Sequence, residues 1–319
     1  MENVLEARNL SVHYHPRQQP VLAVDDVTFV LAEGHTLGVV GETGCGKSTL
    51  GKAILGILPP RTKVSGSLAL RGKELLDLSE AEYRRLRGED LALIFQDPMT
   101  RLDPLMTIRD HFIETVRAHD KEASKDEATA RAIRVLRSMG IPESRLDHYP
   151  HEFSGGMRQR IMIAMALVLR PKLLVADEPT TALDVIVEAQ ILEILQDLRR
   201  AYQMSLLLIT HNLGIVAEIC DRTAVMYAGK LVELGPVEGV FRHPIHPYTQ
   251  GLLASTISLT TKELRSIDGA PPSLLDPPKG CRFHPRCTFA KDICKDKEPP
   301  MVEYRPGHAA ACHFGGDFV

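Results

Sequence analysis

The sequence predicts an α/β fold with a mostly parallel sheet, an inserted helical subdomain and a loop-rich, cysteine-bearing C-terminal extension. Short apolar segments that suit buried strands alternate with helical patterns, which favours a parallel sheet covered by helices. A glycine-rich loop stands between one such strand and one such helix. Four of the six cysteines and a cluster of prolines follow residue 255, so the end of the chain is expected to form a second, loop-rich unit.

Length and composition narrow the class of protein. A chain of 319 residues with 44% hydrophobic and 25% charged residues suits a soluble protein with one large domain and an appendage. The net charge of −3 gives no electrostatic reason to expect a nucleic acid partner. The longest apolar run, Ile161 to Leu169, is far shorter than a membrane span, and the segment from Met1 to Asn3 does not begin a signal peptide. We therefore expect a cytoplasmic chain.

The first elements are predicted as strands followed by a helix. Val4 to Tyr14 and Ala23 to Ala32 have the alternating or continuous apolar residues of strands. His35 to Val40 reads as a short buried strand, and Lys47 to Ile57 carries apolar residues at helical spacing. The residues between these last two segments therefore form a loop between a strand and a helix.

That loop, from Gly41 to Ser48, reads Gly-Glu-Thr-Gly-Cys-Gly-Lys-Ser and matches the phosphate-binding P-loop pattern. Glycines let the backbone wrap closely round phosphates, while N–H groups and the helix N-terminus supply positive potential. Lys47 can reach the β- and γ-phosphates, and Ser48 can bind Mg²⁺. The candidate residues of this nucleotide site are Gly41, Glu42, Thr43, Gly44, Cys45, Gly46, Lys47, Ser48 and Thr49. We interpret Cys45 as a small residue that fits the loop, although a nearby lysine could lower its pKa.

The middle of the chain predicts the inserted subdomain and then more strands. After a strand at Leu91 to Phe95, a helical pattern runs from about Ile108 to Leu169. Strand and helix patterns then alternate, through Leu173 to Ala176, Val185 to Tyr202, Ser205 to Thr210, a further helix, and Thr223 to Tyr227. No later segment repeats the glycine-rich loop, so the chain carries one nucleotide cassette and a second would come from a partner.

Two adjacent carboxylates end the strand that starts at Leu173. Asp177 is predicted to hold Mg²⁺, directly or through water, and Glu178 to orient and deprotonate an attacking water, a role worth roughly 10² to 10⁴ in rate. The alternative is a carboxylate cluster that caps a helix. Upstream, Ser154, Gly155 and Gly156 open an apolar helix and place a hydroxyl and two amides at its positive end.

The cysteines of the extension have metal-site character. Cys281, Cys287, Cys294 and Cys312 are separated by five, six and seventeen residues. A reducing cytoplasm disfavours disulfides, and four thiolates can hold Zn²⁺ or an iron–sulfur cluster. The spacing does not choose between these two, and unligated structural cysteines are the third alternative. Further potential ligands are His284, His308 and His313.

The motifs occur in the order found in ATP-binding subunits of ABC transporters, which the chain resembles. The loop at 41–48, the Ser154-Gly155-Gly156 signature and the Asp177-Glu178 pair carry the resemblance. It extends to Phe95-Gln96-Asp97-Pro98 as the glutamine loop, Thr181-Ala182-Leu183-Asp184 after the acid pair, and Ile209-Thr210-His211 as the histidine switch.

The resemblance implies roles for these residues. Glu178, His211 and Gln96 would form the catalytic set, with Gln96 sensing the metal and His211 contacting the γ-phosphate. Ser48, Gln96 and Asp177 would surround Mg²⁺. Ser154, Gly155 and Gly156 would bind ATP held by an opposite subunit, so that catalysis requires a dimer. Tyr14 falls where the family stacks an aromatic ring on adenine, although a tyrosine of the core is an alternative.

The C-terminal segments make the resemblance narrower. His243-Pro244-Ile245-His246-Pro247-Tyr248-Thr249, Asp268-Gly269-Ala270-Pro271-Pro272 and the tail cysteines are similar to the extension of the oligopeptide and dipeptide transporter branch, which includes nickel importers. In that branch the cysteines are associated with a [4Fe–4S] cluster, which favours iron–sulfur over Zn²⁺. The expected domains are 1–255, a nucleotide-binding domain with a helical subdomain at about 97–170, and 256–319, the extension.

The implied function is ATP hydrolysis that energises uptake of dipeptides and oligopeptides. The expected partners are a second ATPase subunit, identical or homologous, two transmembrane permease subunits and, indirectly, an external solute-binding protein. The chain would then sit peripherally on the cytoplasmic face of the membrane. Import of nickel or another solute is the first alternative. A soluble ABC ATPase outside transport is the second, although such proteins usually carry two cassettes or a long coiled coil, and neither feature is found here.

Overall fold

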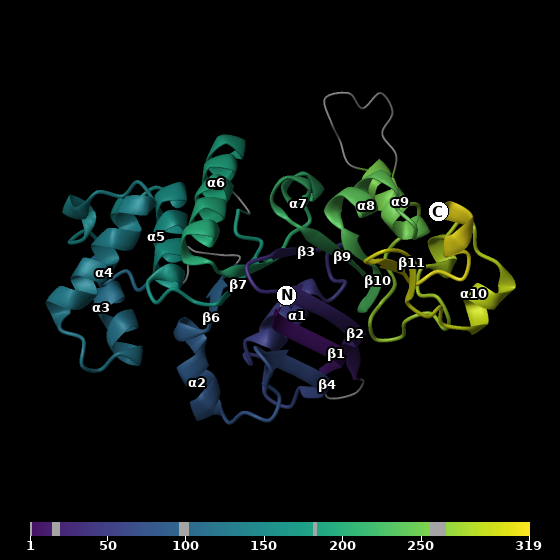
Figure 1. Cartoon of the computed structure of the whole chain (residues 1–319), viewed down its shortest axis with the longest axis horizontal. Helices are drawn as coiled ribbons and strands as arrows, with labels where there is room; N and C mark the ends of the chain where they lie inside the picture. The colour runs from purple at the N-terminus through teal and green to yellow at the C-terminus, as the bar shows by residue number, and fades with distance from the viewer. Residues whose placement is uncertain (1, 15–19, 96–101, 181–183, 256–265) are drawn as a thin grey trace. The chain divides into compact units, whose positions relative to one another are not determined.

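The computed structural model describes residues 2–14, 20–95, 102–180, 184–255 and 266–319. The chain divides into two compact units, the first formed by Met1–Asp77 with Leu208–Val319 and the second by Leu78–Leu207. Figure 1 labels the helices and strands of both units. Helices and parallel strand pairs occur together, so the predicted α/β class is confirmed.

Unit 1 contains an antiparallel sheet with strand order β2-β1-β4-β5. Its strands are β1 (Asn3–Tyr14), β2 (Val21–Ala32), β4 (Lys63–Leu70) and β5 (Lys73–Glu74). The two long strands bury alternate apolar residues, for example Leu10 and Val12 in β1, because successive side chains of a strand point to opposite faces. This sheet therefore has one face in the core of its unit.

Unit 1 also contains strands in the order β11-β12-β10-β9-β3. They are β3 (Thr36–Val40), β9 (Arg222–Tyr227), β10 (Lys230–Pro236), β11 (Val302–Arg305) and β12 (His308–Ala310). β3 runs parallel to β9, whereas the other pairs are antiparallel. All five residues of β3 are buried, as expected for a strand covered on both faces.

Unit 1 also contains helices, and its C-terminal segment packs against the strand that leads into the P-loop. The helices are α1 (Lys47–Ile54), α7 (Leu213–Ile219), α8 (Val237–Arg242), α9 (Pro247–Ala254) and α10 (Asp292–Asp296), with 3-10 turns at His284–Arg286 and Gly315–Phe318. One buried cluster combines Val40, Tyr227, Tyr248 and Phe283. In Figure 1 the yellow C-terminal segment accordingly lies beside α9 and β10.

Unit 2 is mainly helical. Its helices are α2 (Glu80–Glu89), α3 (Ile108–His119), α4 (Lys125–Ser138), α5 (Gly155–Leu167) and α6 (Val185–Tyr202), with 3-10 turns at Glu143–Arg145 and Pro150–Glu152. Its strands follow the order β8-β7-β6, namely β8 (Ser205–Ile209, which crosses the division), β7 (Leu173–Asp177) and β6 (Leu91–Ile94). The helical pattern predicted from Ile108 to Leu169 thus resolves into α3, α4 and α5, of which α4 contacts both others.

The cysteine extension is more ordered than its prolines indicated. It contains α10 and two short strands, and β12 pairs with β10 through Ala310 opposite Glu233 and Ala309 opposite Leu234. The extension thus continues a sheet of unit 1. The two units divide the chain at residues 77 and 207. This division does not test the predicted domain boundary at residue 255 or the predicted subdomain limits at about 97–170, so both stay predictions.

Candidate functional site

The P-loop follows β3 and leads into α1, with its backbone packed against other strands. At Gly41, a Cβ atom would lie 2.2 Å from the Met226 carbonyl oxygen; at Gly46, whose φ is +108°, it would lie 2.1 Å from that of Ala23. A side chain at either position would therefore collide with backbone. Close packing thus requires glycine at Gly41 and Gly46, whereas Gly44 has no atom within 4 Å of its Cβ position and is favoured by its φ of +83°.

Lys47 is held inside this loop. Its ammonium donates hydrogen bonds to the Gly41 carbonyl oxygen at 2.8 Å and to the Glu42 carbonyl oxygen at 3.1 Å, and the residue is only 6% exposed. A buried ammonium needs such acceptors, because burial without partners is costly. The loop's own carbonyls thus fix the position of the group predicted to reach the phosphates.

Cys45 lies within the P-loop, and Tyr14 of β1 lies beside the helix that begins there. Burial raises the pKa of the Cys45 thiol, despite the nearby ammonium of Lys47, which supports the interpretation of Cys45 as a small residue that fits. The Tyr14 hydroxyl lies 3.1 Å from the Thr49 hydroxyl. The ring therefore lies beside the first turn of α1, which begins within the P-loop motif.

His211 follows β8 within unit 1. The backbone N–H of Thr210 donates to the Val39 carbonyl oxygen at 3.2 Å, so the segment next to His211 is bonded to the strand that leads into the P-loop. Asn212 caps α7 by accepting from the Gly214 N–H at 3.0 Å. The cap of α7 is thus Asn212, and His211 next to it is exposed.

The carboxylate pair lies in unit 2. Asp177 is the last residue of β7, and Glu178 has a φ of +48°, a left-handed conformation that costs a non-glycine residue roughly 1–2 kcal/mol. The cap of the next helix, α6, is Asp184. Asp177 and Glu178 therefore end a strand, which disfavours the helix-capping alternative.

The Ser154 signature also lies in unit 2. Ser154 caps α5 by accepting from the Met157 N–H at 3.4 Å. Ser154 and Gly155 are exposed, and a Cβ at Gly155 would meet no atom within 4 Å, whereas one at Gly156 would lie 2.9 Å from Val187. The N-terminal end of α5 is open to solvent at Gly155, with room for a ligand.

Gln159 connects this helix to the segment after the carboxylates. Its amide Nε2 donates to the Pro179 carbonyl oxygen, and Thr180 donates to the Glu188 carboxylate of α6 at 2.6 Å. The signature helix and the segment next to Glu178 are thus joined inside one unit. Of the other predicted positions, Gln96 and 181–183 lie outside the described residues.

The four tail cysteines line one cavity of about 20 Å³, with aromatic rings around them. The lining residues are Cys281, Cys287, Cys294 and Cys312, with Phe283, Phe289, Phe314, Phe318, His246, Pro247, His284 and His313. Burial raises the pKa of Cys281 to about 11 and raises those of Cys287 and Cys312. No disulfide joins these cysteines, and within the described ranges no group of three His, Cys, Asp or Glu residues is arranged to hold a metal ion.

The three histidines considered as further ligands differ in their contacts. His284 and His313 line this cavity, whereas His308 is buried and its Nε2 lies 2.7 Å from the Glu233 carboxylate. That carboxylate also accepts from the N–H groups of Ile245 and His246, each at 2.8 Å. His308 therefore belongs to a buried polar contact between β12 and β10, and it is not one of the residues that line the cysteine cavity.

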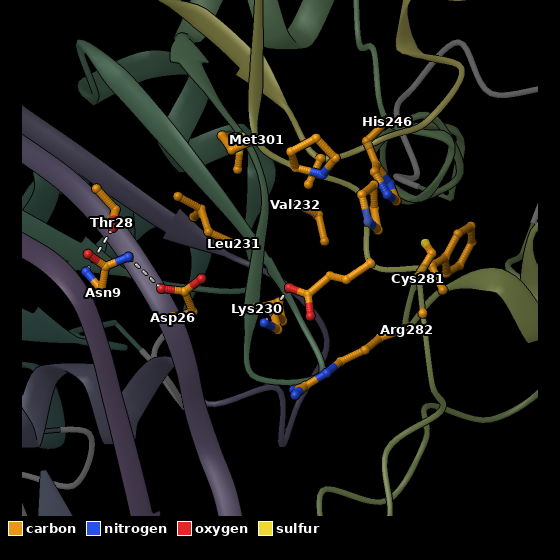
Figure 2. Close-up of a pocket in the computed structure, with 16 residues that line it drawn as sticks. Asn9, Asp26, Thr28, Lys230, Leu231, Val232, His246, Cys281, Arg282 and Met301 are labelled. Atoms are coloured by element: carbon orange, nitrogen blue, oxygen red, sulfur yellow. Dashed lines mark hydrogen bonds and ion pairs between the residues drawn. The ribbon is translucent and has the colours of Figure 1, made fainter. Parts of the chain in front are cut away.

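Figure 2 shows a larger cavity of about 430 Å³ beside the cysteines. Asn9 and Thr28 approach it from β1 and β2, Lys230 from β10, and Cys281 and Arg282 from the C-terminal segment. The two cations along it are paired with two carboxylates, because Lys230 contacts those of Asp25 and Glu298, and Arg282 contacts that of Asp25. The cavity therefore presents balanced charge.

Sequence reasoning missed two residues that contact the P-loop. Arg286 forms an ion pair with Glu42, and the Tyr248 hydroxyl accepts from the Glu42 N–H. Arg286 lies between Cys281 and Cys287, and Tyr248 lies in the His243 to Thr249 segment. Both segments had other predicted roles. No local pattern indicates a contact over such long sequence separations.

Comparisons with known proteins show the family of this chain. A family model described as "ABC transporter" matches residues 24–181, and one described as "Oligopeptide/dipeptide transporter, C-terminal region" matches residues 232–294. The chain is 47% identical to the oligopeptide transport ATP-binding protein OppD of Salmonella typhimurium, over 97% of this chain and 93% of that protein. It is 46% identical to the dipeptide transport ATP-binding protein DppD of Bacillus subtilis, over 98% and 95% of the two chains.

Solved structures support the fold. The chain is similar to cbiO1 of Clostridium perfringens, part of an ABC transporter complex, with a TM-score of 0.65 and 28% identity over 76% of this chain and 92% of that one. It is equally similar to the cassette MJ0796, with a TM-score of 0.65 and 25% identity over 73% and 98% of the chains. No described helix has the length and apolar character needed to cross a bilayer. Because it is 46–47% identical to these relatives over nearly its full length, the chain belongs to the ATP-binding, ATP-hydrolysing subunits of ABC transporters, in the oligopeptide and dipeptide branch.

Proposed function

We propose that this chain hydrolyses ATP to power uptake of dipeptides and oligopeptides through separate membrane subunits. The observation that carries the proposal is the identity of 46–47% to peptide-transport ATP-binding proteins along nearly the whole chain. The match to the oligopeptide and dipeptide C-terminal region supports the same cargo class. Nickel or another solute is the alternative cargo, since selectivity should reside in the other subunits.

In this proposal the P-loop binds the phosphates of ATP through its amides and Lys47, while Tyr14 stacks on adenine. Ser48, Gln96 and Asp177 would hold Mg²⁺, which would supply neutralisation of charge on the phosphates. Glu178 takes the proton of the attacking water and His211 contacts the γ-phosphate. The proposed role of His211 is supported by the hydrogen bond from the adjacent Thr210 N–H to Val39 of β3, and that of Glu178 by its position directly after β7.

A second ATPase subunit completes the proposed reaction. The open N-terminus of α5 at Ser154, Gly155 and Gly156 suits a γ-phosphate presented by another chain, because helix N-termini attract anions. Hydrolysis removes that phosphate and releases the contact. Two permease subunits and an external solute-binding protein complete the proposed transporter, and this chain lies on the cytoplasmic face of the membrane.

Uptake in cells tests the cargo. Cells lacking this chain are given labelled dipeptides, oligopeptides or Ni²⁺, after restoration with the wild type or with Glu178→Gln. Peptide uptake that is lost with the chain and restored only by the wild type is the expected result. Loss of nickel uptake alone would assign the chain to metal import, and unchanged uptake of all three would overturn the cargo assignment.

We further propose that Cys281, Cys287, Cys294 and Cys312 hold a [4Fe–4S] cluster, with Zn²⁺ as the alternative. The proposal is supported by the four thiols that line one cavity together with four phenylalanines, since thiolates are the donors that hold such clusters. The described side chains are not arranged as a metal site, so the proposal rests on the type of donor and on the shared cavity. A cluster bound there would crosslink the extension and could exchange an electron. The cysteines would bind it as thiolates, so binding would release protons.

Anaerobic purification followed by iron, sulfide and zinc analysis distinguishes these centres. About four irons and four sulfides per chain, with a visible absorption band that Cys287→Ser removes, is the expected result. One zinc per chain would favour the alternative. If the purified chain contains neither iron nor zinc, the cysteines are structural thiols. Intact ATPase activity in a metal-free Cys287→Ser variant would indicate a structural or docking role for the centre.

A further inference from the structure

A buried arginine of the C-terminal extension binds the P-loop directly. The side chain of Arg286 is 6% exposed, and its guanidinium donates to the two carboxylate oxygens of Glu42 at 2.7 and 3.0 Å. Glu42 is the second residue of the P-loop motif. Paired parallel hydrogen bonds of this kind fix geometry as well as charge.

The remaining donors of Arg286 are also used. The guanidinium donates to the Tyr227 hydroxyl at 3.3 Å and to the carbonyl oxygens of Asp268 at 2.9 Å and Ile267 at 3.2 Å. An arginine has five N–H donors, and these three contacts and the two to Glu42 account for all of them. Arg286 is therefore built into its site, and its contact with Glu42 does not depend on a mobile surface side chain.

Glu42 in turn connects to Lys47. The Glu42 carbonyl oxygen accepts from the Lys47 ammonium at 3.1 Å and from the Cys45 N–H at 3.2 Å. The Glu42 N–H donates to the Tyr248 hydroxyl of α9 at 2.9 Å. The residue that Arg286 holds by its side chain is thus bonded by its main chain to the lysine expected to bind the phosphates.

A second arginine of the same segment supports the other side of the loop. Arg282 donates to the Ala228 carbonyl oxygen and to the Asp25 carboxylate. The adjoining Gly229 N–H donates to the Cys45 carbonyl oxygen at 2.8 Å. Figure 2 shows Arg282 extended from the backbone next to Cys281. The segment from Cys281 to Cys287 therefore reaches the P-loop by one direct and one indirect route.

The charge of Glu42 gives the direct route a consequence for ATP. A carboxylate within a phosphate-binding loop repels the polyphosphate, and the repulsion is largest where the group is screened from water. The guanidinium of Arg286 cancels this charge. Without Arg286, the loop would present a negative group and the Glu42 carboxylate would lose its ion pair.

We propose that Arg286 is a positioning residue for ATP: it neutralises and orients Glu42, so that the folded C-terminal extension forms part of the nucleotide site of this chain. The proposal rests on the assignment of the P-loop as that site. Family-model matches place the P-loop and Arg286 in different regions, 24–181 and 232–294. The extension therefore supports nucleotide binding in addition to any role of its cysteines.

A double-mutant cycle tests this inference. The dissociation constant of Mg-ATP is measured by calorimetry on the full chain carrying Arg286→Gln, Glu42→Gln or both. We expect Arg286→Gln to weaken binding by about tenfold or more, and Glu42→Gln by less than about threefold. Addition of Glu42→Gln to Arg286→Gln should restore affinity to within about threefold of wild type, because the unpaired charge is gone. Unchanged binding by Arg286→Gln, or no recovery in the double variant, overturns the proposal.

Three further variants separate this effect from loss of folding and from failure of the site assignment. Arg286→Lys keeps the charge but not the paired hydrogen bonds, and an affinity between those of wild type and Arg286→Gln is expected. It replaces Arg286→Gln in the cycle if that variant does not fold. Arg109→Gln removes another two-bond ion pair, with Asp147 at 2.6 and 3.0 Å, and should leave binding unchanged. Normal binding by Lys47→Ala overturns the P-loop assignment itself, whereas loss in Lys47→Ala with none in Arg286→Gln overturns only this inference.

Discussion

The P-loop and the Ser154 signature both place glycines at the start of a helix, but Gly46 of the P-loop and Gly155 of the signature have opposite surroundings. In the P-loop, a side chain at Gly46 would overlap backbone at 2.1 Å, and Lys47 is buried and doubly hydrogen bonded. In the signature, Ser154 and Gly155 are exposed and Gly155 has open space around it. One loop is already fixed by its own chain, while the other offers free space at a helix N-terminus.

This difference separates two kinds of binding. A site whose donors are fixed before the ligand arrives loses little entropy on binding, which suits the P-loop as the primary ATP site. An exposed helix terminus attracts anions only weakly by itself. It becomes effective when another surface presents a phosphate to it, as an opposing subunit would. The comparison predicts that P-loop changes affect binding to one chain, whereas signature changes affect assembly and turnover.

Glu178→Gln should have the largest effect of these variants. It also tests whether the P-loop of one chain and the signature of another bind the same nucleotide. The amide cannot take the proton of water, so the hydrolysis rate should fall by roughly 10² to 10⁴ while ATP affinity is retained. Trapped ATP should then hold a dimer. Steady-state phosphate release and size-exclusion chromatography with and without ATP measure the two effects.

The control is Glu193→Gln, which neutralises an exposed carboxylate of α6 and should leave turnover and assembly unchanged. Steady-state hydrolysis equal to wild type in Glu178→Gln would remove Glu178 from its proposed role. If Glu178→Gln loses hydrolysis yet stays monomeric with ATP, the signature does not bind a phosphate presented by a partner. That result would contradict the role given to the signature in this comparison.

Paired alanine substitutions at Gly46 and Gly155 test the comparison most directly. Gly46→Ala places a methyl group into the Ala23 carbonyl at a φ of +108°. Such strain costs about 1–3 kcal/mol before any overlap is counted, so ATP affinity should fall by about a hundredfold. Gly155→Ala meets no atom within 4 Å and should change binding to the isolated chain by less than about twofold. Calorimetric titration of both variants measures this, and equal losses would contradict the distinction.

The P-loop and its flanking elements were predictable because they are local. β3, the loop and α1 are consecutive, and their apolar spacing and glycines reveal strand, turn and helix directly. The same holds for β7, whose apolar run ends at Asp177. In contrast, the bond between Glu42 and Arg286 spans 244 positions. Only the packing of the complete unit brings such a pair together, so no local pattern could indicate it.

Segments with weak patterns were missed for a related reason. β4 buries only Leu68 and Leu70 and contains Gly66, and α2 is rich in charged residues, so neither has the apolar periodicity of a buried element. β11 and β12 lie among prolines and glycines, and β12 is ordered by pairing with β10. Their structure depends on a distant partner strand, which outweighs the local preference for a loop.

Tyr14→Ala should have an intermediate effect that sharpens the description of the P-loop region. Stacking of a base on an aromatic side chain is worth about 1–3 kcal/mol in nucleic-acid complexes, so loss of the ring should weaken ATP binding by about tenfold. Tyr14→Phe keeps the ring but removes the contact with the Thr49 hydroxyl at 3.1 Å, and should bind almost as wild type. If both variants lose affinity equally, the hydrogen bond to α1 is the feature that matters. If neither does, Tyr14 is only a strand residue.

Cys45→Ala should have the smallest effect, although Cys45 lies inside the phosphate-binding motif. The thiol is 5% exposed, and burial raises its pKa, so it carries no negative charge to bind or repel at neutral pH. Alanine fits the same space and keeps the main-chain bond from Gly229 to the residue 45 carbonyl at 2.8 Å. ATP affinity should change by less than about threefold, and the native thiol should react slowly with iodoacetamide at pH 7, which mass spectrometry of the modified peptide measures. Rapid modification that ATP prevents, or a tenfold loss of affinity in the variant, would show that Cys45 contacts the ligand and that the fixed P-loop depends on this side chain as well as on its glycines.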